Sequence, residues 1–154
     1  MQNFEPIVNK ISDQLGAIFR PASPFELAKL ESLGLPEPVL AFYRDFEPFG
    51  ADAGQIRLWP IEHILEENEA AIPGCYSSQQ GYVVFASTFC GDAYCFDIRP
   101  GADADPPIVL ISHEIVNEST TTSELNRIAK PVARNLSDFL QRFLRGDVDE
   151  DCIY

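Results

Sequence analysis

The chain has few basic side chains. Its 154 residues include 11 Lys and Arg against 24 Asp and Glu, giving a formal net charge of -13 at pH 7. Residues 1–124 hold 19 acidic and 6 basic residues, whereas residues 125–146 hold 1 acidic and 5 basic residues. Nucleic-acid binding depends on Lys and Arg that displace counterions from phosphates, so DNA or RNA is a disfavoured partner. The negative charge has two alternative explanations: it only keeps the protein soluble, or it attracts cationic protein partners.

Long apolar runs are also missing. No stretch approaches the roughly 20 apolar residues that span a membrane. The first residues lack the basic segment and apolar run of a secretion signal. We therefore expect a cytoplasmic protein with no membrane partner. Its 45% hydrophobic content is that of an ordinary globular protein, and its length fits one domain.

Residues typical of catalytic or metal sites are sparse. The histidines are His63 and His113, and the cysteines are Cys75, Cys90, Cys95 and Cys152. The cysteine spacing lacks the CxxC form of zinc sites, and no recognised nucleophile motif accompanies either histidine. We predict free thiols and no catalytic, metal-binding or cofactor-binding residues. An enzyme that unites Cys, His and Asp through its fold remains the alternative hypothesis.

Helical patterns dominate the first third of the chain. Apolar residues recur at helical spacing near the start of the chain and predict an amphipathic helix over about 5–19 with one buried stripe. These residues are Ile7, Ile11, Leu15 and Ile18. Ser23-Pro24-Phe25-Glu26 has the form of a capping box and predicts a second helix that stops at Gly34. A third helix opens at Leu35-Pro36 and continues to Phe46.

Strand patterns follow in the middle of the chain. After a turn at 52–54, the alternation of Gln55–Trp59 predicts a strand, and Pro60 then permits a short helix. Further strands are expected at about 81–87 and 93–98, together with Ile108–Ile111, and these can form an antiparallel meander.

The last part combines a polar run with a strong helix. Asn117–Ser123 reads as an exposed loop or a weak edge strand. Asn135 or Ser137 can cap a final amphipathic helix that ends at Gly146. We predict an α+β fold, with N-terminal helices, a central and mainly antiparallel sheet and a C-terminal helix. Residues 1–146 would form a single domain, followed by a loose acidic C-terminal tail at 147–154.

Four motifs in a fixed order resemble a known family. They are Leu35-Pro36 leading to Leu40-Ala41-Phe42-Tyr43; Leu58-Trp59-Pro60-Ile61; Phe85-Ala86 with Gly91-Asp92 and Tyr94-Cys95-Phe96-Asp97; and Leu136-Ser137-Asp138-Phe139-Leu140. Together they resemble the SUKH superfamily, which includes the fungal Smi/Knr cell-wall-assembly regulators and many bacterial toxin-immunity proteins. The chain departs from the family at Phe89-Cys90, where the turn is often richer in glycine.

The resemblance implies a helix-flanked, strongly curved sheet that binds another protein without catalysis. The leading role is that of an immunity protein which neutralises a co-encoded toxin. A cationic toxin that acts on nucleic acid would suit an acidic inhibitor, because the inhibitor can occupy its substrate cleft. The alternative is a regulatory or scaffold adaptor related to the cell-wall-assembly regulators.

The motif residues are expected to be mainly architectural: Trp59, Pro60, Phe85, Gly91, Asp92, Tyr94, Phe96 and Asp97. Trp59 could anchor an interface, but packing in the core is favoured because a Trp side chain buries a large apolar area. Asp92 and Asp97 are expected to accept hydrogen bonds from turn amides.

The candidate partner-binding residues are all acidic. Four lie on the predicted short helix, namely Glu62, Glu66, Glu67 and Glu69, and are expected to face outward. Five more are expected on loops, where rigid scaffolds often carry binding residues: Asp45, Glu47, Asp52, Asp103 and Asp105. The ordinary alternative for the helix is a solvated charged face.

Overall fold

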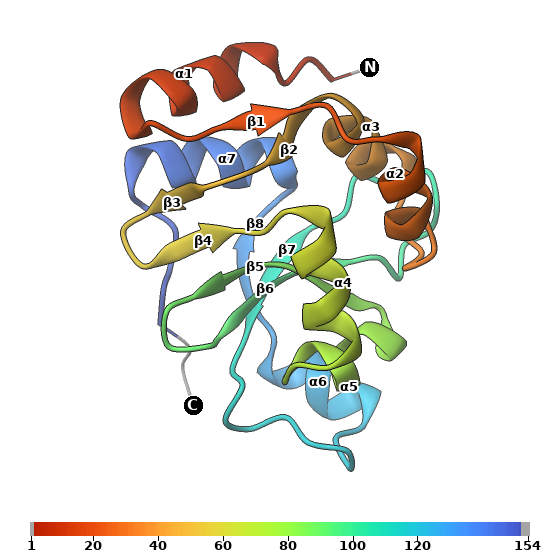
Figure 1. The fold of residues 1–154 in the computed structure, drawn as a ribbon. Coiled ribbons are helices and arrows are strands. Elements are labelled where there is room, and N and C mark those ends of the chain that lie inside the picture. The colour runs from red at the N-terminus through yellow and green to blue at the C-terminus, as the bar shows by residue number, and fades with distance from the viewer. Residues whose placement is uncertain (1, 152–154) are drawn as a thin grey trace.

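The computed structural model describes residues 2–151 (Figure 1). Its helices are α1 (Glu5–Leu15), α2 (Pro24–Glu31), α3 (Glu37–Phe46), α4 (Ile61–Glu69), α5 (Gly74–Ser77), the 3-10 turn η1 (Ser78–Gln80), α6 (Thr122–Ile128) and α7 (Leu136–Arg145). Its strands are β1 (Phe19–Arg20), β2 (Glu47–Pro48), β3 (Ala51–Ala53), β4 (Ile56–Leu58), β5 (Tyr82–Thr88), β6 (Ala93–Asp97), β7 (Ile108–Ile111) and β8 (Lys130–Ala133). The predicted α+β fold is confirmed. Within residues 2–151, no helix is long and apolar enough to cross a membrane.

Six strands form one antiparallel meander in chain order, β3-β4-β5-β6-β7-β8, while β1 and β2 pair separately. The register shifts between Val84 and Ala86, and again between Ile108 and Val109. Such irregularities bend a strand and increase its twist. The central strands β5, β6 and β7 are buried along their whole length. Strands of a sheet that is covered on both faces have continuous apolar sequences, and these three strands follow that pattern.

Each face of the sheet has its own apolar cluster. Phe85 and Phe96 stack at 4.2 Å between ring centroids, and Phe139 of α7 packs edge-on against Phe85 at 5.1 Å. Helices α1, α2, α3 and α4 contribute to this larger cluster. Val84 and Cys95 point to the opposite face, where helices α5 and α6 cover them. Figure 1 shows α5 and α6 at the end of the molecule away from α1 and α7.

The first helix is shorter than predicted. It ends at Leu15 because Gly16 adopts φ 69° and donates its N–H to the carbonyl of Ser12. The predicted stripe is wrong at its end, since Ile18 is 60% exposed and Leu15 is 37% exposed. The capping box of the second helix is confirmed, because Ser23 Oγ accepts the N–H of Glu26 at 3.1 Å.

Two segments differ from prediction because neighbouring elements fix them. The expected turn at 52–54 is partly the strand β3, which pairs with β4. Within the polar run, Thr121 caps α6 by accepting the N–H of Glu124, and β8 then pairs with β7. The prediction of a loose tail from residue 147 is wrong at Val148, which is buried in the larger cluster. Residues 152–154 lie outside the described part of the chain.

Candidate partner-binding surface

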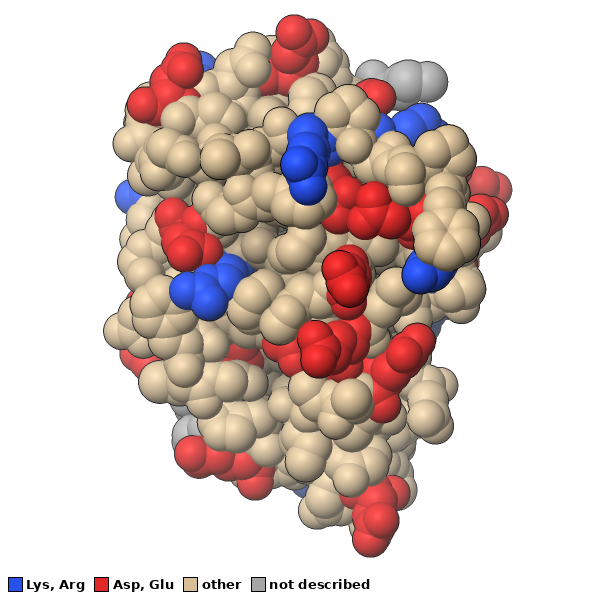
Figure 2. Space-filling view, viewed as in Figure 1, with Lys and Arg blue, Asp and Glu red and all other residues tan. Residues whose placement is uncertain are grey.

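Helix α4 presents an acidic outer face. Ile61 and Ile64 anchor the helix in the core, which leaves Glu62, Glu66 and Glu69 exposed. Figure 2 shows acidic side chains gathered over α4 and toward α2. Within residues 2–151, these three carboxylates form no ion pair with Lys or Arg; Glu66 has a contact of 3.8 Å with His63. The face therefore keeps its negative charge.

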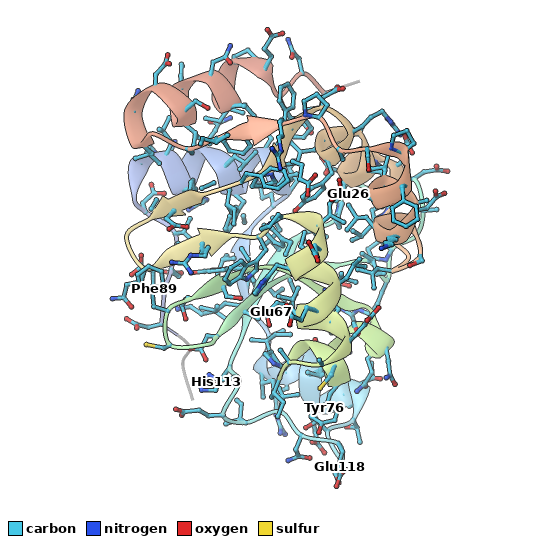
Figure 3. The ribbon with its side chains drawn as sticks, in the orientation of Figure 1. Glu26, Glu67, Tyr76, Phe89, His113 and Glu118 are labelled. Atoms are coloured by element: carbon cyan, nitrogen blue, oxygen red, sulfur yellow. The ribbon has the colours of Figure 1, made fainter. Side chains whose placement is uncertain are left out.

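Glu67 departs from the predicted outward orientation. Its side chain is only 19% exposed, and its Oε1 accepts the Ser87 hydroxyl at 3.0 Å. The Ser87 hydroxyl in turn accepts Trp59 Nε1–H at 2.8 Å. This chain of hydrogen bonds ties α4 to strand β5 and to the end of β4, and Figure 3 places Glu67 over the sheet. Glu67 thus orients Trp59 rather than belonging to the free acidic face.

An aromatic stack lies beside that face. Trp59 packs on His63 with ring centroids 3.6 Å apart. The guanidinium of Arg57 lies 5.4 Å from the Trp59 ring centre and 5.1 Å from that of Phe89, whose side chain is 60% exposed. A small pocket of about 360 Å³ is lined by Arg57, Trp59, Thr88 and Phe89. Trp and Arg are the residues most enriched among binding hot spots.

The sequence prediction captured this stack only in part. Trp59 was expected in the core, but it is half-buried and packs against the core from its edge. Arg57, His63 and Phe89 were not predicted as binding residues. The available signal was the departure at Phe89-Cys90 from the turn of the resembled family, and the side chain of Phe89 is exposed. The stack adds apolar contact area to a surface that charge alone had indicated.

Glu47 is misplaced by the sequence prediction. The residue belongs to β2 and is 1% exposed, not in a loop. Its Oε2 accepts the N–H of Ile61 at 2.8 Å, while Oε1 has no hydrogen-bond partner in the described chain. Burial raises the pKa of Glu47, Glu26 raises it further, and the hydrogen bond from Ile61 and the charge of Arg20 oppose the rise. Glu47 therefore holds the start of α4 and is no surface contact.

The other predicted acidic residues lie in separate places. Asp52 pairs with Arg57 at 3.1 Å, so its charge is partly neutralised beside the stack. Asp105 has a raised pKa because of burial, opposed by a hydrogen bond with Asn135. Asp45 and Asp103 line one groove next to α3, and no residue of α4 lines it. The nine candidates thus do not form one continuous site.

The two motif aspartates anchor loops. Asp92 was expected to accept amides of its own turn; it accepts instead the N–H of His113 and lies 2.7 Å from His113 Nδ1. Asp97 accepts the N–H and the guanidinium of Arg99, which lowers the pKa of Asp97. Both carboxylates therefore fix the ends of β6 to neighbouring backbone.

The two histidines have different partners. His63 stacks on Trp59, whereas His113 pairs with Asp92. Cys75 and Cys90 are free thiols, Cys95 is buried in β6, and Cys152 lies outside the described residues. Among residues 2–151, no group of three or more His, Cys, Asp or Glu side chains could hold a metal ion.

A comparison with protein-family models supports the resemblance that the order of the motifs indicated. No curated protein sequence matches the chain significantly. The model of the SMI1 / KNR4 family (SUKH-1) matches residues 21–142, from just before α2 into α7. The match leaves α1 outside and includes the acidic helix and the aromatic stack. The chain therefore belongs to the SMI1 / KNR4 family (SUKH-1).

Proposed function

We propose that this protein is a non-enzymatic module that binds a basic protein partner through α4 and the adjoining aromatic stack. The observation that carries the proposal is the position of Glu62, Glu66 and Glu69, which lack Lys or Arg partners in the described chain, beside Trp59 and Phe89. Family membership supports a non-catalytic module, and members of this family commonly bind partner proteins.

The two parts of the surface have different physical roles. Carboxylates at the edge of an interface attract a cationic partner and set its orientation, and this effect weakens in salt. The Trp59–His63 stack and the exposed ring of Phe89 offer apolar area that can be buried on contact. Arg57 lies between both rings, so its position is set before binding. Ordered side chains lose less entropy when a complex forms.

The finer proposal is immunity against a co-encoded toxin. A toxin that cleaves or modifies nucleic acid needs a cationic cleft, and an acidic helix can cover that cleft. A toxin-like reading frame beside the gene would supply the partner to test. If the partner instead proves to be an abundant cellular protein, the role is that of a regulatory adaptor.

The test uses a catalytically inactive form of that neighbouring toxin, titrated by calorimetry. We expect a stoichiometric complex that weakens as salt is added. The variant Glu62→Gln/Glu66→Gln/Glu69→Gln should weaken it by about tenfold or more. The matched control is Glu114→Gln/Glu118→Gln/Glu124→Gln, which removes the same charge from exposed positions outside α4. Equal losses in both variants would show that only total charge matters, and no complex at low salt would refute the immunity role.

A further inference from the structure

A second hollow lies between the N-terminal segment and helix α3. It has a volume of about 640 Å³ and is lined from one side by Gln2–Glu5 and from the other by α3. We call it the N-terminal groove. Its size falls within the roughly 300–1,000 Å³ typical of binding sites. Residues 2–5 lie outside the residues that match the family, so one wall of the groove is formed by sequence beyond that match.

The floor of the N-terminal groove is apolar and firmly held. Phe4, Ala41 and Phe46 contribute to it. The ring of Phe42 lies in the core beneath, 5.0 Å from Phe4 and 6.0 Å from Phe46 between centroids. Because both floor rings pack on a fully buried side chain, the hollow is built before any ligand arrives.

The rim carries a net negative charge. Its ionisable residues are four acids and one base, namely Glu5, Glu37, Asp45, Asp103 and Arg44. Arg44 pairs with Glu37 at 3.1 Å. Within the described chain, Glu5, Asp45 and Asp103 form no ion pair, and all three are exposed. Three unneutralised carboxylates therefore surround an apolar floor.

The backbone holds these carboxylates in place from three segments. Glu5 begins α1, Asp45 belongs to the last turn of α3, and Asp103 lies in the loop between β6 and β7. That loop is attached to α3, because the N–H of Glu37 donates to the carbonyl of Ala102 at 3.1 Å. The position of Asp103 at the rim is thus fixed by the fold.

We infer that the N-terminal groove binds a basic peptide segment of a partner protein. An apolar side chain of the segment would rest on Phe4 and Phe46, and flanking Lys or Arg side chains would reach Glu5, Asp45 and Asp103. The charge complementarity decides the occupant: the rim repels phosphates and acidic peptides, and the apolar floor favours a peptide over a simple cation. The groove is separate from α4, so this site extends the proposed function by a second contact.

The probe is the peptide acetyl-Gly-Lys-Arg-Leu-Phe-Lys-Arg-Gly-amide, added to the ¹⁵N-labelled full chain. Saturable shifts of the amide signals of Phe4, Ala41 and Phe46 are expected, and salt should weaken them. A second peptide, with Ser-Ser in place of Leu-Phe, should bind at least about tenfold more weakly because it leaves the floor uncovered. Equal binding of both peptides would mean that charge alone attracts them and would overturn the proposal.

Two variants separate the groove from the acidic helix. Asp45→Asn/Asp103→Asn should weaken the response at the groove by about tenfold, since two exposed charge contacts are lost. Glu62→Gln/Glu66→Gln, with the same loss of charge on α4, should leave that response unchanged. Shifts confined to α4, or equal sensitivity to both variants, would exclude the groove while leaving the proposed function intact. Conversely, a groove response that persists in a protein that does not bind the toxin would support the groove and count against the proposed function.

A further substitution tests the floor itself. Ala41→Phe fills the groove without changing its charge, and thermal unfolding of the variant shows whether the fold is kept. A folded variant should lose the groove response. If a folded Ala41→Phe variant binds the Leu-Phe peptide as tightly as the natural chain, the floor does not hold the peptide and the inference fails.

Discussion

The carboxylate of Glu47 accepts the backbone N–H of Ile61 at 2.8 Å, which joins strand β2 to the first turn of α4. The first amides of a helix lack partners within the helix, so this contact caps α4 from outside. The contact places a charged group in a buried position, and its second oxygen has no hydrogen-bond partner in the described chain. Glu47 thus fixes the acidic helix at a cost in desolvation.

Glu47→Gln should raise the free energy of unfolding at neutral pH by about 1 kcal/mol, because an amide oxygen still accepts the Ile61 N–H without a buried charge. Burial raises the folded-state pKa above the ordinary 4.5, so the folded chain holds the proton more tightly. The resulting stability is present below the unfolded pKa and is lost as pH rises through the folded pKa.

Urea titrations across the acidic and neutral range measure this difference. The gain from Glu47→Gln should be largest near neutral pH, should shrink as the pH falls through the raised folded-state pKa, and should be smallest below the ordinary value. Glu31→Gln is the control, because it removes an exposed carboxylate and should change the pH profile little. A Glu47→Gln protein that is less stable than the natural chain at neutral pH would show that the carboxylate is favourable where it lies.

Asp138 gives the opposite pH dependence. A hydrogen bond from the N–H of Arg134 at 2.9 Å lowers the pKa of Asp138, and Arg142 and Arg134 add to the effect. Asp138→Asn should therefore lower the free energy of unfolding at neutral pH by about 1 kcal/mol. The natural contribution is present above the unfolded pKa and is lost as pH falls through the folded pKa.

The measurement is again denaturant unfolding, at neutral pH and at a pH below the lowered folded-state pKa, which lies under the ordinary value of 3.8. The two proteins should differ at neutral pH and converge in acid. Asp13→Asn, an exposed change in α1, serves as control. A difference that persists unchanged in acid would assign the effect of Asp138→Asn to packing and not to charge.

Trp59→Ala should destabilise the chain by about 2 kcal/mol, less than the 3–5 kcal/mol typical of a fully buried ring. The ring is only half-buried, but it packs against the core and donates to Ser87. Trp59→Phe keeps most of the apolar area and should cost about 1 kcal/mol through the lost hydrogen bond. Urea titration of both variants checks the order, and equal losses would show that the hydrogen bond carries the whole effect.

The sequence revealed those elements whose signals are local. Helix α7 was predictable because Asn135 caps it, Gly146 ends it and a strong apolar face lies between them. Strand β8 was missed because Pro131 interrupts a short segment that is a strand through its pairing with β7. Helix α6 was missed in a polar run, although Thr121 and Glu124 are spaced as a capping pair.

The candidate site was less predictable because its relationships span long sequence distances. The acidic face of α4 could be read from one short helix. Glu47 and Asp45 are two residues apart, yet one is buried under α4 and the other is exposed at the N-terminal groove. The approach of Asp103 to α3 depends on the β6–β7 loop, and no local pattern reports it. Charge could therefore suggest candidates but could not assign them to surfaces.

The close packing of α5 against α4 leaves less room for a side chain at Gly74 than at the other glycines of the described chain. A Cβ added at Gly74 would overlap the backbone carbonyl of Glu67 and approach a methyl group of Val84 at 3.0 Å. Since a backbone carbonyl in a helix cannot move aside alone, Gly74→Ala should lower the free energy of unfolding by about 2–3 kcal/mol. Chemical denaturation measures the loss.

Gly16→Ala is the matched control for Gly74→Ala. Its Cβ would meet nothing within 4 Å among the described residues, but its φ of 69° disfavours a side chain, so its cost should be only about 1 kcal/mol. Gly74→Ala should also weaken partner binding, because displacement of Glu67 disturbs its hydrogen bond to Ser87 and thereby the position of Trp59. Gly16→Ala has no such connection. If the two variants are equally stable and bind equally well, the packing of α5 against Glu67 does not support the proposed surface.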